Sequence, residues 1–259
     1  MSNFRTEHDF LGEKQIPNNC YYGVQTVRAK ENFDITGIPI GSEPLFIKAF
    51  GHVKKAAAMA NRDLGVLDAK KAEAIIYACD RLIAGEFADQ FISDLIQGGA
   101  GTSTNMNANE VIANLGLEYM GHQKGEYQYL HPNNDVNLSQ STNDAYPSAF
   151  RIAIYLKIES FTNALEQLQD SFFQKGKEFA NVIKMGRTQL QDAVPMTLGQ
   201  EFNAFATTIG EDVIRLRQSE RLITEVNMGA TAIGSKVNAP EGYPYLCVKY
   251  LVEVCGVLV

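Results

Sequence analysis

Three segments of the chain are rich in small, uncharged side chains that form hydrogen bonds. They are GGAGTSTNMNANE (98–110), HPNNDVNLSQSTND (131–144) and KMGRTQLQDAVP (184–195). Each lies at the end of a predicted helix, where backbone N–H groups lack partners and the helix dipole attracts anions. Serine, threonine and asparagine add directed hydrogen bonds. The combination favours a site that binds a carboxylate and stabilises negative charge developing on it, as an oxyanion hole does.

The glycine-rich start of the first segment does not match the usual phosphate-binding motifs. A P-loop requires a lysine after the glycines, and none follows here. The dinucleotide motif G-x-G-x-x-G fails at Thr104. A purely structural explanation also exists for each segment: Ser141 can cap a helix that starts near Ala145, and Thr188 with Gln189 can close a turn between two helices.

The remaining pattern predicts a mainly α fold. Helical periodicity covers residues 46–63, 69–84 and 105–120. Prolines and glycines punctuate residues 1–45, which we expect to be irregular. Residues 121–144 are polar and have no helical repeat.

Two long helices are predicted after this region. Residues 151–183 contain no proline, and apolar residues recur there at intervals of three and four: Ile154, Ile158, Phe161, Leu165, Leu168 and Phe172. A second such pattern covers 197–226, and a loop around 186–195 would join the two as antiparallel helices. No strongly alternating strands are evident.

We expect an N-terminal α-rich domain (1–140), followed by the first long antiparallel helices of a central helical bundle (141–259). Two helices cannot bury a full apolar seam alone, so further helices from elsewhere in the subunit or from other subunits are needed.

Composition excludes several classes of partner. The net charge is −7 and the basic residues are dispersed, which argues against nucleic acid and acidic membrane surfaces. The four cysteines are far apart and include no C-x-x-C, so neither a disulfide framework nor a zinc site is expected. The N-terminus has no signal-peptide pattern, and no run of 18 apolar residues occurs. The expected location is the cytoplasm.

Read in order, the motifs resemble those of the aspartase and class II fumarase superfamily. They are YYGVQTVRAKENF (21–33), GGAGTSTNMNANEV, HPNNDVN, SQSTNDAYP, GRTQLQDAVPMTLGQEF and GATAIG (229–234), and they span nearly the whole chain. GAGTSTNMN and STNDAYP are more similar to the aspartase branch than to fumarases, whose usual versions resemble GSGTQ-NMN and SSNDxFP. The resemblance implies anti β-elimination of ammonia from L-aspartate to give fumarate, through an aci-carboxylate intermediate. Fumarate hydration is the alternative within the superfamily.

The resemblance also implies roles for residues in the three segments. The substrate's β-carboxylate and the aci-carboxylate would be bound by Thr102, Ser103, Ser141 and Thr142. Asn143 would face the amino group, and Thr188 would hold the α-carboxylate with Gln189 beside the leaving group. His131, Asn133 and Asn134 match a segment that forms a secondary anion site in fumarases, a site often considered non-catalytic.

Many relatives have histidine at the position of Gln189, and the glutamine favours deamination over dehydration. A hydroxyl group leaves well only when an acid protonates it, whereas ammonium already carries its proton. Glutamine cannot act as that acid, but its carbonyl oxygen can accept a hydrogen bond from ammonium.

One signature of the family is absent. The motif G-S-S-x-M-P-x-K-x-N, which supplies the serine base and a carboxylate-binding lysine, does not occur; Gly234–Ser235–Lys236 belongs to the GATAIG region instead. We therefore identify no catalytic base here and expect the sequence to be roughly the first half of an aspartase-like subunit. An inactive, truncated helical assembly that binds a carboxylate is the remaining alternative.

The resemblance implies a homo-oligomer, in which four subunits build the bundle and each active site draws on three of them. The substrate would be a small dicarboxylate, with no redox cofactor. Divalent metal activates some relatives, but the sequence contains no metal-ligand cluster.

Overall fold

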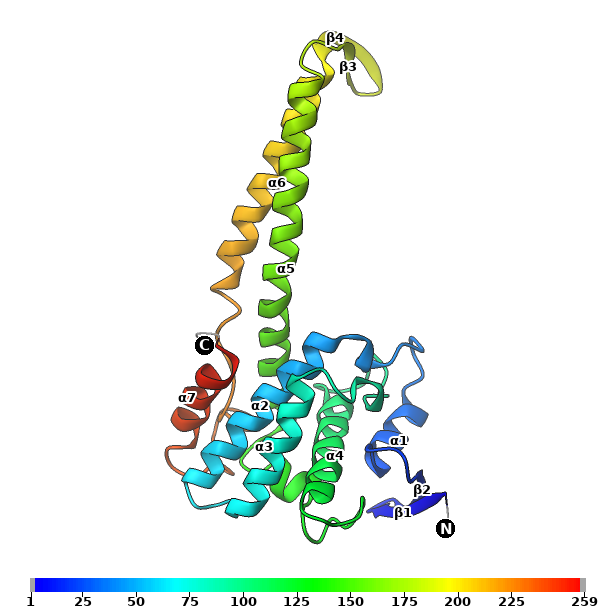
Figure 1. Cartoon of the computed structure of the whole chain (residues 1–259), viewed down its shortest axis with the longest axis vertical. Helices are drawn as coiled ribbons and strands as arrows, with labels where there is room; N and C mark the ends of the chain where they lie inside the picture. The colour runs from blue at the N-terminus through cyan, green and yellow to red at the C-terminus, as the bar shows by residue number, and fades with distance from the viewer. Residues whose placement is uncertain (1–2, 257–259) are drawn as a thin grey trace. The chain divides into compact units, whose positions relative to one another are not determined.

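The computed structural model of the chain describes residues 3–256. These residues form two compact units, one made of residues up to 153 together with those from 224 onward, the other of residues 154–223. The mainly α fold is confirmed (Figure 1). The expected domain division at residue 140 stays a prediction.

The first unit contains β1 (Phe4–Asp9), β2 (Gly12–Pro17), α1 (Val24–Asn32), α2 (Pro44–Asp63), α3 (Ala69–Ile83), α4 (Thr102–Tyr119), the start of α5 (Thr142–Glu178) and α7 (Tyr243–Cys255), with short helical turns at Ile40–Ser42, Ala88–Gln90 and Pro132–Val136.

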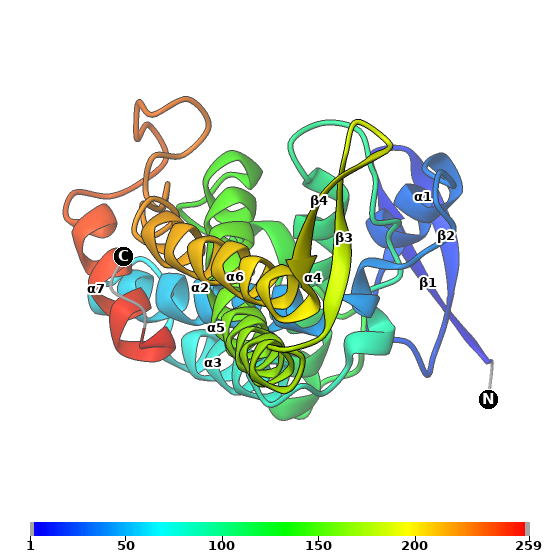
Figure 2. The same ribbon diagram turned by 90° about the horizontal axis from the view of Figure 1, so that it is seen from above.

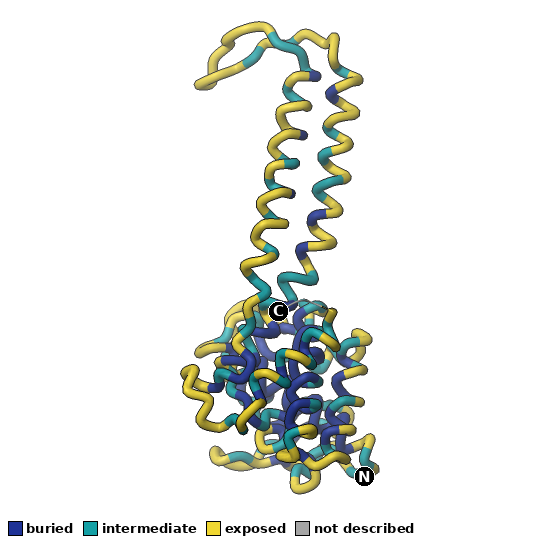
Figure 3. The backbone as a smooth tube through the Cα atoms, turned by 90° about the vertical axis from the view of Figure 1, so that its left-hand side faces the viewer, coloured by how far each residue is buried: buried dark blue, intermediate teal, exposed yellow. Residues whose placement is uncertain are grey.

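The core of the first unit is built from helices that pack closely. Helix α2 contacts α3 and α7, and α3 contacts α4. The alanines of α2 allow this approach, because Ala56, Ala57 and Ala60 are fully buried. Gly116 allows a close approach on α4, where a Cβ would overlap Leu130 and touch Ala74 of α3. The buried segments form the dark centre of this unit in Figure 3.

Helix α4 is buried on every side. All residues from Thr104 to Leu117 are buried, although several of them are polar: Thr104, Asn105, Asn107, Asn109, Glu110 and Asn114. A helix of this kind has no solvent face to receive its polar side chains. Each buried amide or carboxylate therefore needs hydrogen-bond partners inside the protein.

The expectation that residues 1–45 are irregular is wrong. Strands β1 and β2 form an antiparallel hairpin in which Asp9 pairs with Gly12, and α1 follows. The hairpin lacks an alternating apolar pattern because its inward-facing residues include the charged Glu7, which is 3% exposed, beside the fully buried Ile16.

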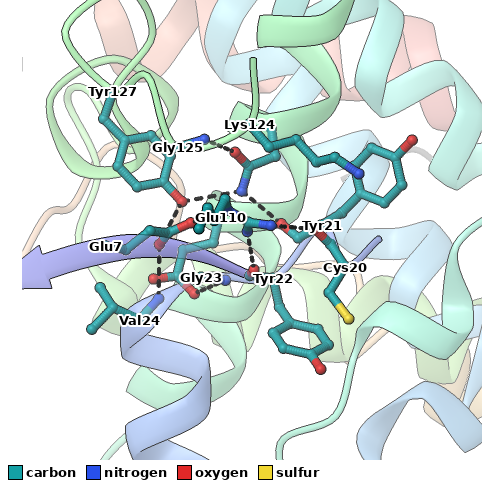
Figure 4. Close-up of polar contacts among 12 residues, drawn as sticks. Glu7, Cys20, Tyr21, Tyr22, Gly23, Val24, Glu110, Lys124, Gly125 and Tyr127 are labelled. Atoms are coloured by element: carbon teal, nitrogen blue, oxygen red, sulfur yellow. Dashed lines mark hydrogen bonds and ion pairs between the residues drawn. The ribbon is translucent and has the colours of Figure 1, made fainter. Parts of the chain in front are cut away.

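Two buried carboxylates hold the beginning of α1. Glu110 of α4 accepts hydrogen bonds from the backbone N–H of Gly23 at 2.8 Å, and Glu7 of β1 accepts one from Val24 at 2.9 Å (Figure 4). The N–H groups of Gln25 and Thr26 also donate to Glu110, at 2.8 and 3.1 Å. The free donors of the first helical turn are thus satisfied by side chains from two other elements.

The second unit consists of the later part of α5, strands β3 (Ile183–Thr188) and β4 (Gln191–Thr197), and α6 (Leu198–Glu220). The predicted antiparallel pair of long helices is confirmed, with the ring of Phe172 lying 5.9 Å from that of Phe202 and 5.8 Å from that of Phe205. Part of the apolar seam stays open, since Phe161 is 52% and Phe205 is 47% exposed. Helix α5 begins nine residues earlier than expected, so Thr142 and Asn143 lie in its first turn.

The connection between the long helices is a β-hairpin, whereas the sequence predicts a plain loop. Figure 2 shows β3 and β4 side by side. Gln189 and Leu190 form the two-residue turn with φ angles of 50° and 63°, the positive values of a type I′ turn. Asparagine and glycine are preferred in such turns, so this one lacks the usual sequence signature. The hairpin is largely exposed, with Ile183 at 79% and Leu190 at 102%.

Gly101, which precedes α4, can be tested against a matched glycine. Its φ is +90° and a Cβ would overlap the ring of Tyr146, whereas Gly121 has a φ of +83° with open space around it. We expect Gly121→Ala to cost about 1–2 kcal/mol through backbone strain. Gly101→Ala should cost roughly 1–3 kcal/mol more through the added overlap. Urea unfolding of both variants measures the difference, and equal costs would contradict the close approach of Tyr146.

Candidate functional site

The first segment places Thr102 and Ser103 at the start of α4. The preceding residue, Gly101, offers no side-chain cap. The N–H of Thr104 is bound by the Gln97 side chain at 2.9 Å. Among the described residues, no side chain caps the N–H groups of Thr102 and Ser103. The hydroxyls of these two residues border a cavity of about 590 Å³ that Arg28 of α1 also lines.

The second segment lies next to the first. Asn105 of α4 donates its side-chain amide to the hydroxyl oxygen of Thr142 at 3.0 Å. Asn143 and Tyr146 line a cavity of about 460 Å³ together with Gly99 and Gly101. The structure thus brings the first two of the three sequence segments together, at the starts of α4 and α5.

Internal hydrogen bonds determine which groups of the Ser141–Asn143 loop can donate a hydrogen bond to a ligand and which can accept one. The Ser141 oxygen accepts from the Asn143 N–H at 3.2 Å, and the Thr142 oxygen accepts from Asn105. Each hydroxyl keeps its own proton to donate. The Asn143 amide donates to the carbonyl of Ala232 at 2.9 Å, which leaves its side-chain oxygen as an acceptor. The loop can therefore donate from the hydroxyls of Ser141 and Thr142 and accept at the side-chain oxygen of Asn143.

The GATAIG segment, to which no binding role was assigned from its sequence, completes this region. Residues Thr231, Ala232 and Asn238 face Ser141 and Thr142 across a cavity of about 510 Å³. The GATAIG motif supports the family resemblance, but nothing in its composition predicts that it lines the cavity. Only the folded chain brings residues 90 positions apart to the same place.

Lys54 is a second group that sequence reasoning missed. Its side chain is fully buried and donates to Asn137 and to Gln140, both at 2.9 Å. Asn137 also accepts from Asn105 at 3.1 Å, so Lys54 supports the segment that leads to Ser141. Burial lowers the pKa of Lys54 to about 7, while the negative charge of Asp144 acts in the opposite direction. The only sequence signal is a lysine within the alanine-rich face of a helix.

Thr188 and Gln189 belong to the other compact unit. Thr188 ends β3 and is paired with Gln191 in the ladder, and Gln189 opens the turn of the hairpin. Both are exposed. Their proposed roles toward a ligand stay predictions.

The His131 segment is already hydrogen-bonded internally. The His131 ring accepts from the N–H groups of Asn133 at 3.0 Å and Asn134 at 3.2 Å, and burial lowers the pKa of His131. Asp135 accepts from the His131 N–H at 2.7 Å and forms an ion pair with Lys71 at 2.9 Å. Backbone donors that would suit an anion are thus occupied by the ring, and the secondary anion site stays a prediction.

Two further kinds of feature are absent from the described residues. Within residues 3–256, no group of three or more histidine, cysteine, aspartate or glutamate side chains is arranged to hold a metal ion. None of the helices in that range is both long and apolar enough to cross a membrane.

Comparisons with known proteins point to one family. A family model described as "Lyase" matches residues 12–258. The chain is 58% identical to the aspartate ammonia-lyase of Pseudomonas fluorescens over 256 residues, which cover 98% of this chain and 54% of that protein. It is 54% identical to the aspartate ammonia-lyase of Escherichia coli K12 over 256 residues, with the same coverage. The chain thus spans about half the length of the curated relatives it matches.

Solved structures agree with this similarity. A Brucella melitensis protein described as fumarate lyase:delta crystallin, in its cobalt-bound structure, superposes with a TM-score of 0.94 at 51% identity, over 99% of this chain and 56% of that one. The class II fumarase of Schistosoma mansoni superposes with a TM-score of 0.85 at 32% identity, over 98% of this chain and 53% of that one.

The buried Lys54 should give the protein a distinctive pH dependence. Its pKa of about 7 in the folded chain lies below the ordinary value of 10.5, so between these values the unfolded chain holds a proton that the folded chain has lost. The free energy of unfolding contributed by Lys54 must then rise with pH, by at most about 1.4 kcal/mol per pH unit. The difference in stability between wild type and Lys54→Met should shift in favour of wild type from pH 7 to 9.5. Urea unfolding at several pH values measures it, and parallel profiles would show that Lys54 stays charged.

Proposed function

The chain belongs to the lyase family whose model matches residues 12–258, and on that basis we propose that it is the amino-terminal part of an aspartate ammonia-lyase. The proposed reaction is anti β-elimination of ammonia from L-aspartate to give fumarate. Identity of 58% to an aspartate ammonia-lyase over nearly the whole chain supports this choice within the family. The covered length supports the view that further parts of the active site come from outside these residues.

The polarity of the Ser141–Asn143 loop is the observation that carries the proposal. A carboxylate accepts hydrogen bonds, and the hydroxyls of Ser141 and Thr142 have protons to donate. An ammonium group donates, and the side-chain oxygen of Asn143 is available to accept. Aspartate carries a carboxylate and an ammonium group on adjacent carbons, so the order of groups along the loop fits this substrate class.

The start of α4 would supply charge stabilisation. A base outside this chain removes the proton from the carbon beside the β-carboxylate, and the electron pair moves into that carboxylate to form the aci-carboxylate. The added negative charge is stabilised by the open N–H groups of α4 and the hydroxyls of Thr102 and Ser103. The electron pair then returns to form the carbon–carbon double bond as the C–N bond breaks and neutral ammonia leaves.

The remaining roles follow from the family resemblance. Thr188 would hold the α-carboxylate, and Gln189 would accept a hydrogen bond from the departing ammonium. The exposed apolar seam of the long helices supports assembly into a homotetramer, in which other subunits cover Phe161 and Phe205. We propose a cytoplasmic enzyme that needs no redox cofactor.

Residues 1–259 alone should convert L-aspartate to fumarate at least about 10⁴-fold more slowly than a complete relative, because no positioned base is available. Co-expression with the remaining carboxyl-terminal half of the Pseudomonas fluorescens enzyme should restore turnover. Fumarate formation is followed by ultraviolet absorbance. Fumarate incubated with ammonium should give aspartate, whereas malate formed without ammonium would indicate a fumarase. Robust turnover by 1–259 alone would contradict the assignment of the base to another segment.

Single substitutions in the complemented enzyme test the roles of the loops. Ser141→Ala removes a donor to the aci-carboxylate and should lower kcat by roughly 10²–10³. Gln189→His should stay within about tenfold of the starting rate, since ammonia needs no acid to leave. Steady-state kinetics with L-aspartate compare the two. The leaving-group argument is wrong if the histidine variant is the more impaired.

A further inference from the structure

Asp144 is a buried carboxylate that connects two loops of the site. It is fully buried, and its two oxygens bind different segments. One accepts from the backbone N–H of Ser141 at 2.9 Å, and the other accepts from the backbone N–H of Thr231 at 2.8 Å. Asp144 is not among the residues that line the adjoining cavities, so it acts on the loops and does not contact a ligand there.

The backbone of Thr231 is strained. Its φ is +62°, a value that a β-branched residue rarely adopts, and the residue is buried. Such a conformation persists only when surrounding contacts impose it. The bond to Asp144 is one of these contacts, and the bond from Asn143 to the next carbonyl, that of Ala232, is another.

A third hydrogen bond also connects the segment around Thr231 to the start of α5. The N–H of Asn227 donates at 3.0 Å to the hydroxyl of Ser148, which itself donates to the carbonyl of Asp144 at 2.7 Å. Residues 227–232 are therefore tied to the first two turns of α5 at three points. Among these three side chains, that of Asp144 binds the backbone N–H groups of both Ser141 and Thr231.

We propose that Asp144 is a positioning residue that sets the binding conformation of the Ser141–Asn143 loop by holding it to the strained Thr231 backbone. With the Ser141 N–H bound to Asp144, the Ser141 hydroxyl oxygen accepts from Asn143, and its proton is left for a ligand. With residues 231–232 fixed, the Asn143 amide is bound to Ala232, and its oxygen is left as an acceptor. The inference rests on the proposed function, because the loop is taken to bind a dicarboxylate.

The proposed role requires Asp144 to accept hydrogen bonds at both side-chain oxygens. Burial raises the pKa of Asp144, while the hydrogen bonds from Ser141 and Thr231 and the positive charge of Lys54 act in the opposite direction. A carboxylate accepts at both oxygens, whereas an asparagine would turn an NH₂ group toward one of the two backbone donors. Asp144→Asn must therefore release either Ser141 or Thr231.

The experiment compares fumarate binding to residues 1–259, by NMR titration, between wild type and Asp144→Asn. The matched control is Asp68→Asn, which alters a carboxylate that also accepts from two backbone N–H groups at a helix start, that of α3. We expect the dissociation constant to rise at least tenfold in Asp144→Asn and to stay within twofold in Asp68→Asn, at a temperature where both are folded by circular dichroism. Adding Thr231→Gly to Asp144→Asn should recover at least threefold of the affinity, because glycine adopts a positive φ without strain.

Amide hydrogen exchange gives a readout that does not depend on binding. Asp144→Asn should lower the protection of the Ser141 or the Thr231 amide at least tenfold and leave that of Asn105, which is bound to the Gly101 carbonyl, unchanged. Binding within twofold of wild type in Asp144→Asn, or unchanged protection at both amides, would overturn the inference. If wild type 1–259 binds no fumarate, the titration is repeated with the carboxyl-terminal half present, where absence of binding would count against the proposed function. The exchange data decide the role of Asp144 in either case.

Discussion

The burial of polar side chains along α4 is the constraint on which the first unit depends. This helix has no solvent face between Thr104 and Leu117, so its amides and its one carboxylate need partners from other elements. Asn105 binds Thr142 and Asn137, Glu110 binds the start of α1, and Asn114 binds the carbonyl of Tyr21. Each of these bonds fixes a segment that is distant in sequence. The helix that presents Thr102 and Ser103 at its beginning therefore also determines where the neighbouring loops lie.

The need of buried polar groups for internal partners also explains how the polar groups of the site are oriented. A loop with free hydroxyls and amides would present donors and acceptors at random, because each such group can turn either way. In this protein, each of these polar side chains already forms a hydrogen bond within the protein. Asn105 occupies the acceptor of Thr142, and Ala232 occupies the donor of Asn143. The Asn143 oxygen is thereby turned so that it can accept, while the hydroxyls of Ser141 and Thr142 keep protons to donate. Groups held in this way need no rearrangement when charge develops on a bound carboxylate.

The second unit, unlike the first, leaves part of its apolar surface exposed. Its two long helices share an aromatic contact around Phe172 and Phe202, but Phe161 and Phe205 remain about half exposed. The β3–β4 hairpin is exposed on most of its residues, and a two-stranded hairpin is marginally stable in isolation. Both features are expected of parts that pack against further helices, which agrees with a chain that spans about half the length of its relatives.

Three features could be predicted from the sequence: the helices with regular apolar spacing, the antiparallel pair of long helices and the three segments rich in hydroxyls and amides. Those features are local: periodicity and helix-end composition are written in consecutive residues. The N-terminal hairpin escaped prediction because its inward-facing Glu7 is charged, and its burial depends on bonds with Arg5, α1 and Tyr127. The β3–β4 turn escaped because Gln189 and Leu190 are unusual at positive φ. Lys54, Asp144 and Thr231 acquired their roles from the tertiary structure alone, since burial and the pairing of residues some 90 positions apart depend on which helices pack together, and no local pattern encodes that.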